Sequence, residues 1–471
     1  MLRQAYTQAQ LKQRYHKLKK MDSEQIVQEN IDKIKQELNK NKLIDIEKDQ
    51  QLFFRVVKNK SEVYDIITRA FSRKKRWNEL PHGLDLRNSW NFMWSWSKIR
   101  IDISKLMVWQ KWNHFPQSKQ LCRKDNLKKN LERAMKTSSA HQRQFHIMPE
   151  TFVLPKEYVA FIEAFSESEE VDGQTNYWIM KPAAKSRGRG ISVINDITQV
   201  HYGEPIVIQR YLKNPELLNG FKFDLRVYVL VTSFNPLEAF IYNEGFARLS
   251  TTPFSLDPKH MANKFVHLTN YSIQKNSQNK DECSEIDSIY GGTKISLTSL
   301  RKHYKKKGLD YDDMWEQCKQ ICLKSLAACQ KQIAYNPWCF ELYGYDIMAD
   351  DNGRSWLVEV NSSPSLARDH LLDDIIKQRL IDDTIDVVEP IDFDRKRLFE
   401  VLERRISQDI KQNTSTSGTN AKNNMLNRDL TYILNGAVPR AYGEEPAILG
   451  NYTRIAPTKM SEKYCKMMNG T

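Results

Sequence analysis

The stretch Glu341-Leu-Tyr-Gly-Tyr-Asp-Ile-Met-Ala-Asp-Asp-Asn-Gly-Arg-Ser-Trp-Leu-Val-Glu-Val-Asn361 decides the fold of the region around it. Its two arms, 341–348 and 355–360, are rich in apolar, aromatic and β-branched residues and predict two strands. Between them, Asn352-Gly353 is a strong signal for a two-residue hairpin turn. With that turn, Asp346 lies directly opposite Glu359, and Asn361 lies on the face of Glu359 because side chains alternate along a strand.

The facing carboxylates predict a cation site. Directly paired side chains have Cβ atoms roughly 4.5–5.5 Å apart, and two carboxylates at that distance repel unless a cation lies between them. Two carboxylates and an amide oxygen suit Mg²⁺, which keeps waters and phosphate oxygens as its other ligands. The alternative is an exposed hairpin with a solvated acidic face.

The composition limits the class of protein. A chain of 471 residues with 40% hydrophobic content predicts two or three packed units. No run is long enough for a membrane span, and the N-terminus lacks the apolar core of a signal peptide. The seven cysteines form no CxxC pair, and Cys318 and Cys322 have helical i,i+4 spacing. We therefore expect reduced, structural cysteines and a cytosolic protein.

The net charge of +14 favours an acidic partner: nucleic acid, a membrane surface or an acidic polypeptide. No zinc-finger, RNA-recognition or helix-turn-helix signature is found, which disfavours nucleic acid. The candidate basic clusters are Arg73-Lys-Lys-Arg76, Arg123-Lys124, Lys128-Lys129 and Lys305-Lys-Lys307.

The chain divides by composition. Residues 1–50 are polar and predict a basic extension that is helical or partly disordered. Residues 51–144 begin with a strand and a helix and are dense in tryptophan, so we expect a small aromatic-rich α/β domain. Residues 145–388 alternate strands, loops and helices and hold the candidate chemistry. A C-terminal helix is expected at 389–411, and a flexible linker and tail at 412–471.

A glycine-rich hairpin is the first candidate for nucleotide binding. Trp178-Ile-Met-Lys-Pro182 and 191–194 predict strands, and the loop between them carries Lys185, Arg187, Gly188, Arg189 and Gly190. The glycines permit close backbone approach, and the cations favour phosphate oxygens. The loop is not a Walker A loop, because GxxxxGK[ST] and a following helix are absent. A basic surface turn is the alternative.

Two further strands are expected in the same region. Residues 205–212 predict an apolar strand that ends in a polar hinge, which can offer backbone groups to an adenine edge. In Lys222-Phe-Asp-Leu-Arg226, the charged residues alternate on one strand face, typical of a polar cleft or of a salt-bridged ladder. Arg248 and Lys294 have no acidic partner nearby in sequence and could bind a substrate carboxylate.

Taken together, these motifs resemble the tubulin tyrosine ligase-like family, a branch of the ATP-grasp carboxylate–amine ligases, over roughly residues 53–388. The resemblance also rests on Gly245-Phe-Ala-Arg248, His267-Leu-Thr-Asn270, Asn113-His-Phe-Pro116 and Glu359-Val-Asn-Ser-Ser-Pro-Ser-Leu366. It implies an α/β (α+β) ATP-grasp fold with an N-terminal α/β domain, a central domain and a C-terminal ATP-binding domain.

The resemblance also implies roles for individual residues. ATP would be held by Lys181, Arg187, Gly188, Gln209, Arg210, Tyr211, Leu212, Lys222, Asp224, Thr269 and Asn270. Two Mg²⁺ ions would be held by Asp346, Glu359 and Asn361. The catalytic residues would be Arg226, Arg248 and Lys294, and the incoming amino acid would meet Arg248, Tyr271, Ser272 and Lys294.

The implied reaction joins a free amino acid to a glutamate side chain in the acidic C-terminal tail of tubulin, through an acyl-phosphate. The loop 181–190 is similar to glycine-adding members, whereas 268–272, 340–347 and 359–366 are closer to glutamate-adding members, so we expect glutamate. The alternatives are a glycylase of the same fold, a catalytically idle microtubule-binding protein, and a ligase for a small molecule or another protein. The resemblance places the protein in the cytoplasm and cytoskeleton, at a cilium or basal body, with accessory proteins on its terminal extensions.

Overall fold

The computed structural model describes residues 51–57, 60–81, 89–99, 101–172, 176–183, 188–201, 205–277, 293–411 and 419–469. The expectations for residues 1–50, for Lys185 and Arg187, and for the linker at 412–418 lie outside these ranges. The chain forms two compact units. Unit 1 combines parts of Met1–Phe53, Lys75–Asn91 and Ile391–Pro439, and unit 2 comprises Phe54–Lys74, Phe92–Pro390 and Arg440–Thr471.

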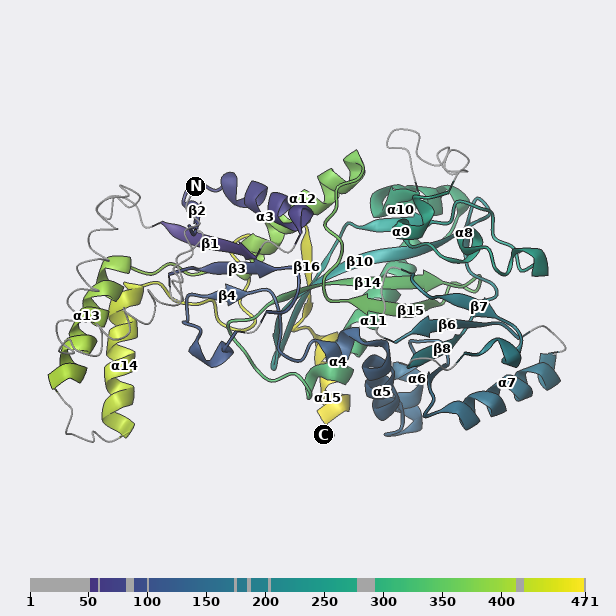
Figure 1. Ribbon diagram of the computed structural model, residues 1–471, viewed down its shortest axis with the longest axis horizontal. Helices are drawn as coiled ribbons and strands as arrows, with labels where there is room; N and C mark the ends of the chain where they lie inside the picture. Colours follow the sequence, from purple (N-terminus) through teal and green to yellow (C-terminus); the bar gives the residue numbers. More distant parts are fainter. Residues whose placement is uncertain are drawn as a thin grey trace, which may run out of the picture. The chain divides into compact units, whose positions relative to one another are not determined.

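Unit 2 is built on an eight-stranded antiparallel sheet around one long strand, β10 (Figure 1). The strands are β9 Leu217–Leu218, β10 Phe221–Phe234, β11 Leu237–Tyr242, β12 Phe246–Leu249, β13 Lys294–Ser296, β14 Glu341–Ala349, β15 Ser355–Asn361 and β16 Tyr452–Ala456. Strand β10 pairs with β12 and then β11 along one edge and with β14 along the other. Residues 227–231 of β10 are fully buried, as their continuous apolar pattern predicts.

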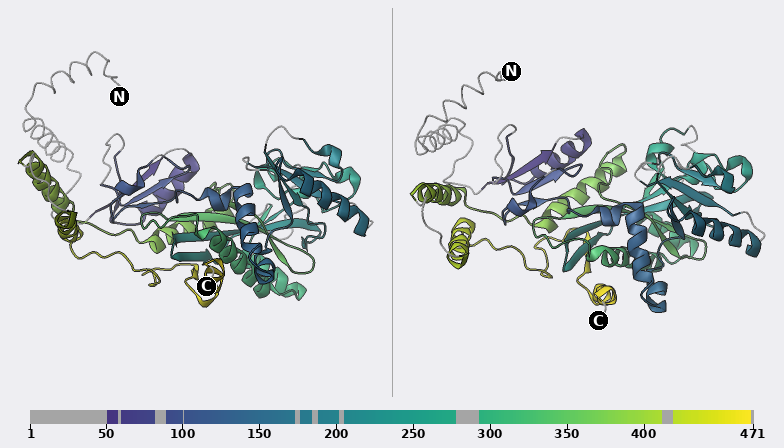
Figure 2. Two further views of the ribbon diagram at one scale, coloured as in Figure 1. Left: turned by 90° about the horizontal axis from the view of Figure 1, so that it is seen from below. Right: turned by 60° about the horizontal axis from the view of Figure 1, so that its bottom comes forward.

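Helices cover this sheet. They are α8 Lys264–His267, α9 Tyr271–Gln274, α10 Leu297–Lys307, α11 Tyr311–Gln330, α12 Leu371–Val388 and α15 Lys459–Asn469. Helix α11 packs against β10, β11, β14, β15 and β16, and α12 lies beside α3 (Ser61–Ser72) in Figures 1 and 2. Among the described helices, none combines the length and apolar character that a membrane span requires.

Helix α11 illustrates how the sequence specifies these elements. Asp310 caps it by accepting a hydrogen bond from the Asp313 backbone N–H. Cys318 and Cys322 lie on its buried face, as their spacing predicted, and both thiols are free. Burial raises the pKa of Cys318 to about 12, so this thiol is inert at neutral pH.

A smaller antiparallel sheet carries the predicted glycine-rich hairpin. Its strands are ordered β5 Thr151–Leu154, β8 Ile206–Arg210, β6 Trp178–Pro182 and β7 Ser192–Ile194. Helix α7 (Tyr158–Asp172) packs Phe161 and Phe165 against Trp178 and Ile208 of this sheet. The predicted strands at 178–182, 191–194 and 205–212 are thus confirmed, although β7 and β8 are shorter.

A third sheet contains the parallel strands β1 Leu52–Val57, β3 Phe92–Ser95 and β4 Lys111–Trp112, in that order, and unit 2 includes β1 from Phe54 onward. Four of the clustered tryptophans are buried, Trp90, Trp94, Trp109 and Trp112, which supports the interpretation as core. The units do not divide at residue 144, because Trp112 exchanges backbone hydrogen bonds with Trp338 and Phe340. Helices α4 Lys119–Cys122, α5 Lys124–Met135 and α6 Ser139–Phe145 follow.

The C-terminal part differs from the expected flexible tail. Strand β16 pairs with β11, placing Tyr452 opposite Tyr242, and α15 packs on α11. Burial of Tyr452, Ile455 and Ala456 at this sheet edge stabilises the segment. The sequence did not predict this strand, because the apolar residues of the segment are isolated. In unit 1, β2 (Trp77–Glu79) precedes α13 (Arg395–Lys411) and α14 (Thr419–Leu434), where Arg404 and Arg405 pair with Asp429.

Candidate active site

The hairpin β14–β15 places Asp346 opposite Glu359, as predicted, but by a different route. The loop has three residues: the Gly353 N–H donates to the Asp350 carbonyl (3.0 Å), and the Asp350 N–H donates to the Arg354 carbonyl (2.9 Å). Gly353 adopts φ +75°, which completes the turn. The predicted two-residue turn was therefore wrong, and the longer loop alone would place Val358 opposite Asp346. A β-bulge after Asp346 restores the pairing with Glu359.

Six charged residues form two rows across five strands of the large sheet, which we call the charged band. The first row is Lys294 of β13, Arg248 of β12 and Asp224 of β10, and the second is Arg226 of β10, Asp346 of β14 and Glu359 of β15. Neighbours within each row are direct cross-strand partners. Asp224 and Arg226 are two residues apart on β10, so both rows lie on one face.

Ion pairs connect the residues of the charged band. They also show that Arg248 and Lys294, for which the sequence suggested no nearby acidic partner, are both paired. Arg248 pairs with Asp224 and also with Asp346 (2.8 Å), while Arg226 donates to Asp346 (2.7 Å). Arg248 therefore has two acidic partners that are not its neighbours in sequence. The salt-bridged ladder and the polar cleft, which the sequence offered as alternatives for this strand face, occur together. Lys294 also has a partner, Asp373 of α12, at 2.8 Å.

The two carboxylates of the candidate metal site have opposite pKa shifts. Burial raises the pKa of Asp346 despite Arg226 and Arg248 beside it. Burial also opposes ionisation of Glu359, but Lys124 at 2.9 Å, helped by Lys181, holds the pKa of Glu359 well below its ordinary range. Glu359 is thus an anion at neutral pH. Sequence reasoning did not assign Lys124 to the site, although it lies in the quoted cluster Arg123-Lys124.

The donor set fits a hard cation. Asn361 shares a face with Glu359 and donates to its Oε1 at 3.3 Å. No group of three or more His, Cys, Asp and Glu side chains in the described part of the chain is arranged for a metal. A magnesium ion here would therefore rely on two carboxylates and one amide, with waters and phosphate oxygens completing its shell.

Gly188, in the loop between β6 and β7, lines one cavity together with Asp224, Asp346 and Glu359 of the charged band. Gly188 has φ +71°, and a Cβ atom at this position would lie 2.4 Å from Ile273 Cδ1 and 3.2 Å from Asn270 Oδ1. Glycine is thus required for the loop to approach Asn270. Lys181 donates to Gln209 Oε1 (2.7 Å), and Gln209 donates to Thr151 Oγ1 (2.9 Å). Burial lowers the pKa of Lys181 to about 8.

Lys222 belongs to a second set of hydrogen-bonded polar side chains, with Tyr211 and His267. Its Nζ donates to the Tyr211 hydroxyl (2.7 Å), which lies 2.9 Å from His267 Nδ1. Burial lowers the pKa of Lys222 to about 7 and, with help from Lys222, that of His267 to about 4. Neutral His267 can accept from Tyr211 through Nδ1 while Nε2 donates to the His260 carbonyl (3.1 Å). His267 lies within a quoted motif but was not assigned a role.

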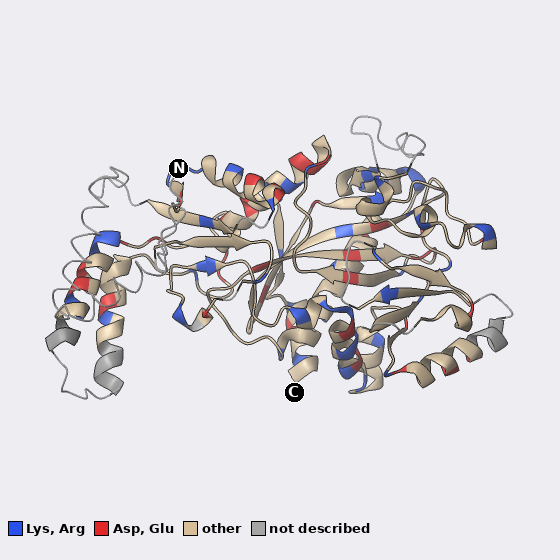
Figure 3. Ribbon diagram, in the orientation of Figure 1, with Lys and Arg blue, Asp and Glu red and all other residues tan. Residues whose placement is uncertain are grey.

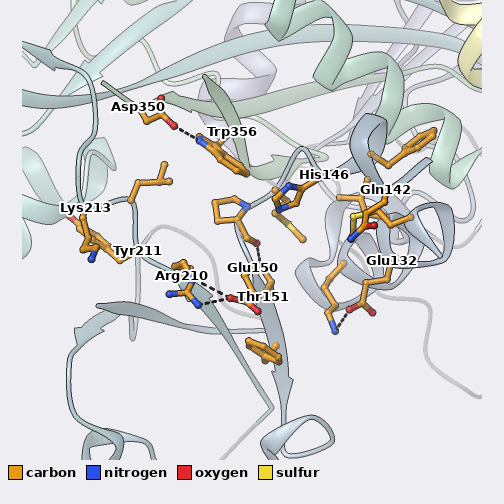
Figure 4. Close-up of a pocket in the computed structure, with 18 of the residues that line it drawn as sticks. Glu132, Gln142, His146, Glu150, Thr151, Arg210, Tyr211, Lys213, Asp350 and Trp356 are labelled. Atoms are coloured by element: carbon orange, nitrogen blue, oxygen red, sulfur yellow. Dashed lines mark hydrogen bonds and ion pairs between the residues drawn. The ribbon is translucent and has the colours of Figure 1, made fainter. Parts of the chain in front are cut away.

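Three adjoining cavities connect the hinge to the charged band. The first is lined by the hinge residues Arg210, Tyr211 and Leu212 together with Met148 and Thr151, and Figure 4 shows Arg210 directed at Glu150. Met148 and Thr151 also line the second cavity. The second shares Lys124, Lys181, Val358 and Glu359 with the third. This third cavity also meets Gly188, Asp224, Thr269, Asn270 and Asp346, so with Lys181 and Glu359 it brings together half of the fourteen predicted ATP and metal residues.

The predicted amino-acid residues gather at the other end of the first row. Lys294 Nζ lies 3.8 Å from the centre of the Tyr271 ring, and the Tyr271 hydroxyl lies 3.2 Å from His370 Nε2. Ser272 follows Tyr271 in α9. Burial lowers the pKa of Lys294, although Asp373 opposes this.

The chain belongs to the tubulin-tyrosine ligase family, whose model matches residues 101–397. It is 38% identical over 335 residues to tubulin polyglutamylase TTLL5 of Mus musculus, covering 68% of this chain and 25% of the relative. It is 33% identical to probable tubulin polyglutamylase TTLL2 of Homo sapiens, covering 72% and 56%, and 37% identical to tubulin monoglutamylase TTLL4 of Mus musculus, covering 59% and 23%. The matched region thus spans about a quarter of TTLL5.

Proposed function

We propose that this protein is an ATP-dependent ligase that adds glutamate to glutamate side chains of an acidic protein tail, that of tubulin. The observation that carries the proposal is the charged band, which sets Asp346 opposite Glu359 beside Arg226 and Arg248, with Lys124 of α5 paired to Glu359. Such a face suits a polyphosphate, a divalent cation and carboxylate substrates together. Family membership and the glutamylase names of its relatives support the same reaction.

The proposed reaction has two steps. A carboxylate oxygen of the acceptor attacks the γ-phosphorus of ATP, the bond to the β-phosphate oxygen breaks, and ADP leaves. The amine of glutamate then attacks the acyl carbon of this acyl-phosphate, phosphate leaves with the bonding electrons, and the nitrogen releases a proton. An isopeptide bond results.

In this scheme the protein positions the reactants and neutralises charge. Lys181 and Lys222 hold phosphate oxygens, and the hinge 209–212 holds the base. Asp346, Glu359 and Asn361 would hold Mg²⁺, which supplies charge neutralisation to the phosphates when bound. Arg226 stabilises charge on the transferred phosphate, and Arg248 and Lys294, with Tyr271 and Ser272, receive the amino acid.

The proposed partner is an acidic tail of tubulin, which assigns the protein to the cytoskeleton; the further assignment to a cilium or basal body rests on the family resemblance alone. The names of the relatives support tubulin, and the net charge of +14 supports an acidic partner. The glycine-adding alternative keeps its support from the loop 181–190.

The test is incubation of the purified chain with microtubules, ATP, Mg²⁺ and either labelled glutamate or labelled glycine. Incorporation of glutamate, lost in tubulin lacking its acidic tails, is expected. Incorporation of glycine alone would establish the glycylase. No incorporation despite microtubule binding would establish the idle binding protein.

A further inference from the structure

Helix α12 contributes two buried charged residues that face the end of the charged band. Asp373 has an exposed fraction of 0%, and its carboxylate accepts from Lys294 (2.8 and 3.0 Å) and from Lys377 (2.7 Å). Lys377 is one helical turn beyond Asp373 and also donates to the Ala367 carbonyl. Both ammonium groups lie near the Phe246 ring, at 5.7 and 5.6 Å from its centre.

This cluster holds one positive charge in excess, because two ammonium groups share one buried carboxylate. The neighbouring carboxylates do not relieve the excess, because Asp346 and Asp224 are paired with Arg226 and Arg248. Asp369 also interacts with Lys294 but is exposed, so water weakens its effect. Burial lowers the pKa of Lys377 to about 8, despite Asp373.

A purely structural tether between α12 and β13 would need only one lysine. A second buried ammonium adds a desolvation cost without a second counter-charge. An incoming anion would supply that counter-charge. The place is suitable, because Lys294 is the cross-strand partner of Arg248 and lies against Tyr271.

We propose that Lys377 is a specificity-determining residue that, together with Lys294, receives the side-chain carboxylate of the donor glutamate, and that Asp373 is the positioning residue that holds both lysines. This proposal rests on the proposed function. A glycine donor lacks this carboxylate and would leave the excess charge buried, which disfavours it.

The experiment compares Lys377→Met with Lys377→Arg and with Arg379→Met, an exposed cation on the same helix. For Lys377→Met we expect the KM for glutamate to rise by about tenfold or more, with the KM for ATP changed less than about twofold. The preference for glutamate over glutamine should also fall. Lys377→Arg should restore part of the preference for glutamate over glutamine. Arg379→Met should leave both this preference and the KM for glutamate unchanged.

The melting temperature distinguishes a role of Lys377 in substrate specificity from a purely structural role. Lys377→Met leaves Asp373 and Lys294 as a balanced pair, so its melting temperature should equal or exceed that of the wild type. A large drop in the melting temperature of Lys377→Met would instead support a purely structural tether between α12 and β13. An equal rise in KM for glutamate and glutamine would overturn the assignment to the side-chain carboxylate, and an unchanged KM would remove Lys377 from the site.

A binding measurement keeps this proposal distinct from the proposed function. Glutamate should raise the melting temperature of the wild type in the presence of Mg²⁺ and a non-hydrolysable ATP analogue, and it should not do so for Lys377→Met. If the wild type binds glutamate in this way but ligates nothing, the ligase proposal fails while the role of Lys377 stands. If the wild type shows no shift with glutamate, the role of Lys377 fails.

Discussion

At the scale of single residues, burial and the nearest partner decide what each charged group of the site can do. Asp346 and Glu359 are direct cross-strand neighbours, yet burial raises the pKa of one while Lys124 keeps that of the other low. Glu359 is therefore a fixed anion, whereas Asp346 depends on Arg226 and Arg248. Substitutions at the two positions should have different effects.

The first prediction concerns the metal ligands. Glu359→Gln should lower the ligation rate by about 100-fold or more, because uncompensated phosphate charge would remain at the site. The fold should survive, since Lys124 keeps some access to solvent. Asp346→Ala should also be inactive but less stable, because Arg226 would lose its carboxylate partner and Arg248 would keep only Asp224. Ligation rates and thermal unfolding test both, with Asp351→Asn in the exposed turn as control. Normal turnover in Glu359→Gln would falsify the metal assignment.

The second prediction concerns Lys222. Its pKa of about 7 means that the free protein has a largely neutral amine at pH 8. Phosphate oxygens favour the ammonium form, so ATP binding should take up protons at pH 8. Above pH 7, affinity should fall by up to about tenfold per pH unit. Calorimetry in two buffers of different ionisation enthalpy measures the uptake. Lys222→Met should bind ATP more weakly and with a flatter pH dependence; an identical uptake in this variant would exclude Lys222 as the titrating group.

At the scale of elements, the basic clusters named from the sequence have different surroundings. Arg73 and Lys74 at the end of α3 pair with Asp382 and Asp386 of α12, and Lys128 of α5 pairs with Glu132 and Glu157. By contrast, Lys305, Lys306 and Lys307 of α10 are exposed, and no ion pair reaches them from the described residues. Figure 3 shows Lys and Arg gathered on α10. This helix is therefore the best candidate for an acidic tail.

The third prediction follows from this contrast. Replacing Lys305, Lys306 and Lys307 by glutamate should weaken microtubule binding, and the loss should be largest at low salt because exposed charges are screened as salt rises. The control carries glutamate at Lys156, Lys331 and Arg379, three exposed cations on other elements. Co-sedimentation at two salt concentrations is the measurement. Equal binding by both variants would show that α10 has no special part in recruitment.

At the scale of the whole molecule, the chain returns after α14 to complete the large sheet of unit 2. Arg440 pairs with Glu238 of β11 (2.7 Å) and Glu389 (3.3 Å), just before β16 joins the edge of β11. Glu238 has an exposed fraction of 4%, so its charge depends on this arginine. The segment 440–456 is therefore part of unit 2, which carries the charged band.

The fourth prediction concerns this closure. Arg440→Ala should lower the free energy of unfolding by about 3 kcal/mol, because it leaves the buried carboxylate without its cation. Although burial opposes it, Arg440 with Thr232 lowers the pKa of Glu238. The stabilisation is therefore present above the unfolded pKa, about 4.3, and is lost as the pH falls through the lower folded value. Urea unfolding at pH 7 and pH 4 measures both effects, with Arg379→Ala as control. An unchanged urea midpoint in Arg440→Ala would show that β16 stays paired with β11 without the Arg440–Glu238 ion pair.

The sequence by itself determined the features that depend on neighbouring residues. Alternation predicted that Lys222, Asp224 and Arg226 share a strand face, and apolar runs predicted the strands of both hairpins. These patterns are local, because they follow from the twofold repeat of a strand and from the backbone freedom of glycine. The family resemblance rested on the same local motifs.

Only the tertiary structure decided which charges meet. Lys294 finds Asp373 at a separation of 79 residues, Arg248 binds carboxylates on two other strands, and β16 completes an edge that the expected tail left open. Even the correct pairing of Asp346 with Glu359 depends on a three-residue loop offset by a bulge. The physical reason is that strand register and helix packing place these groups, and both are set by burial across the whole unit, which no short stretch of sequence specifies.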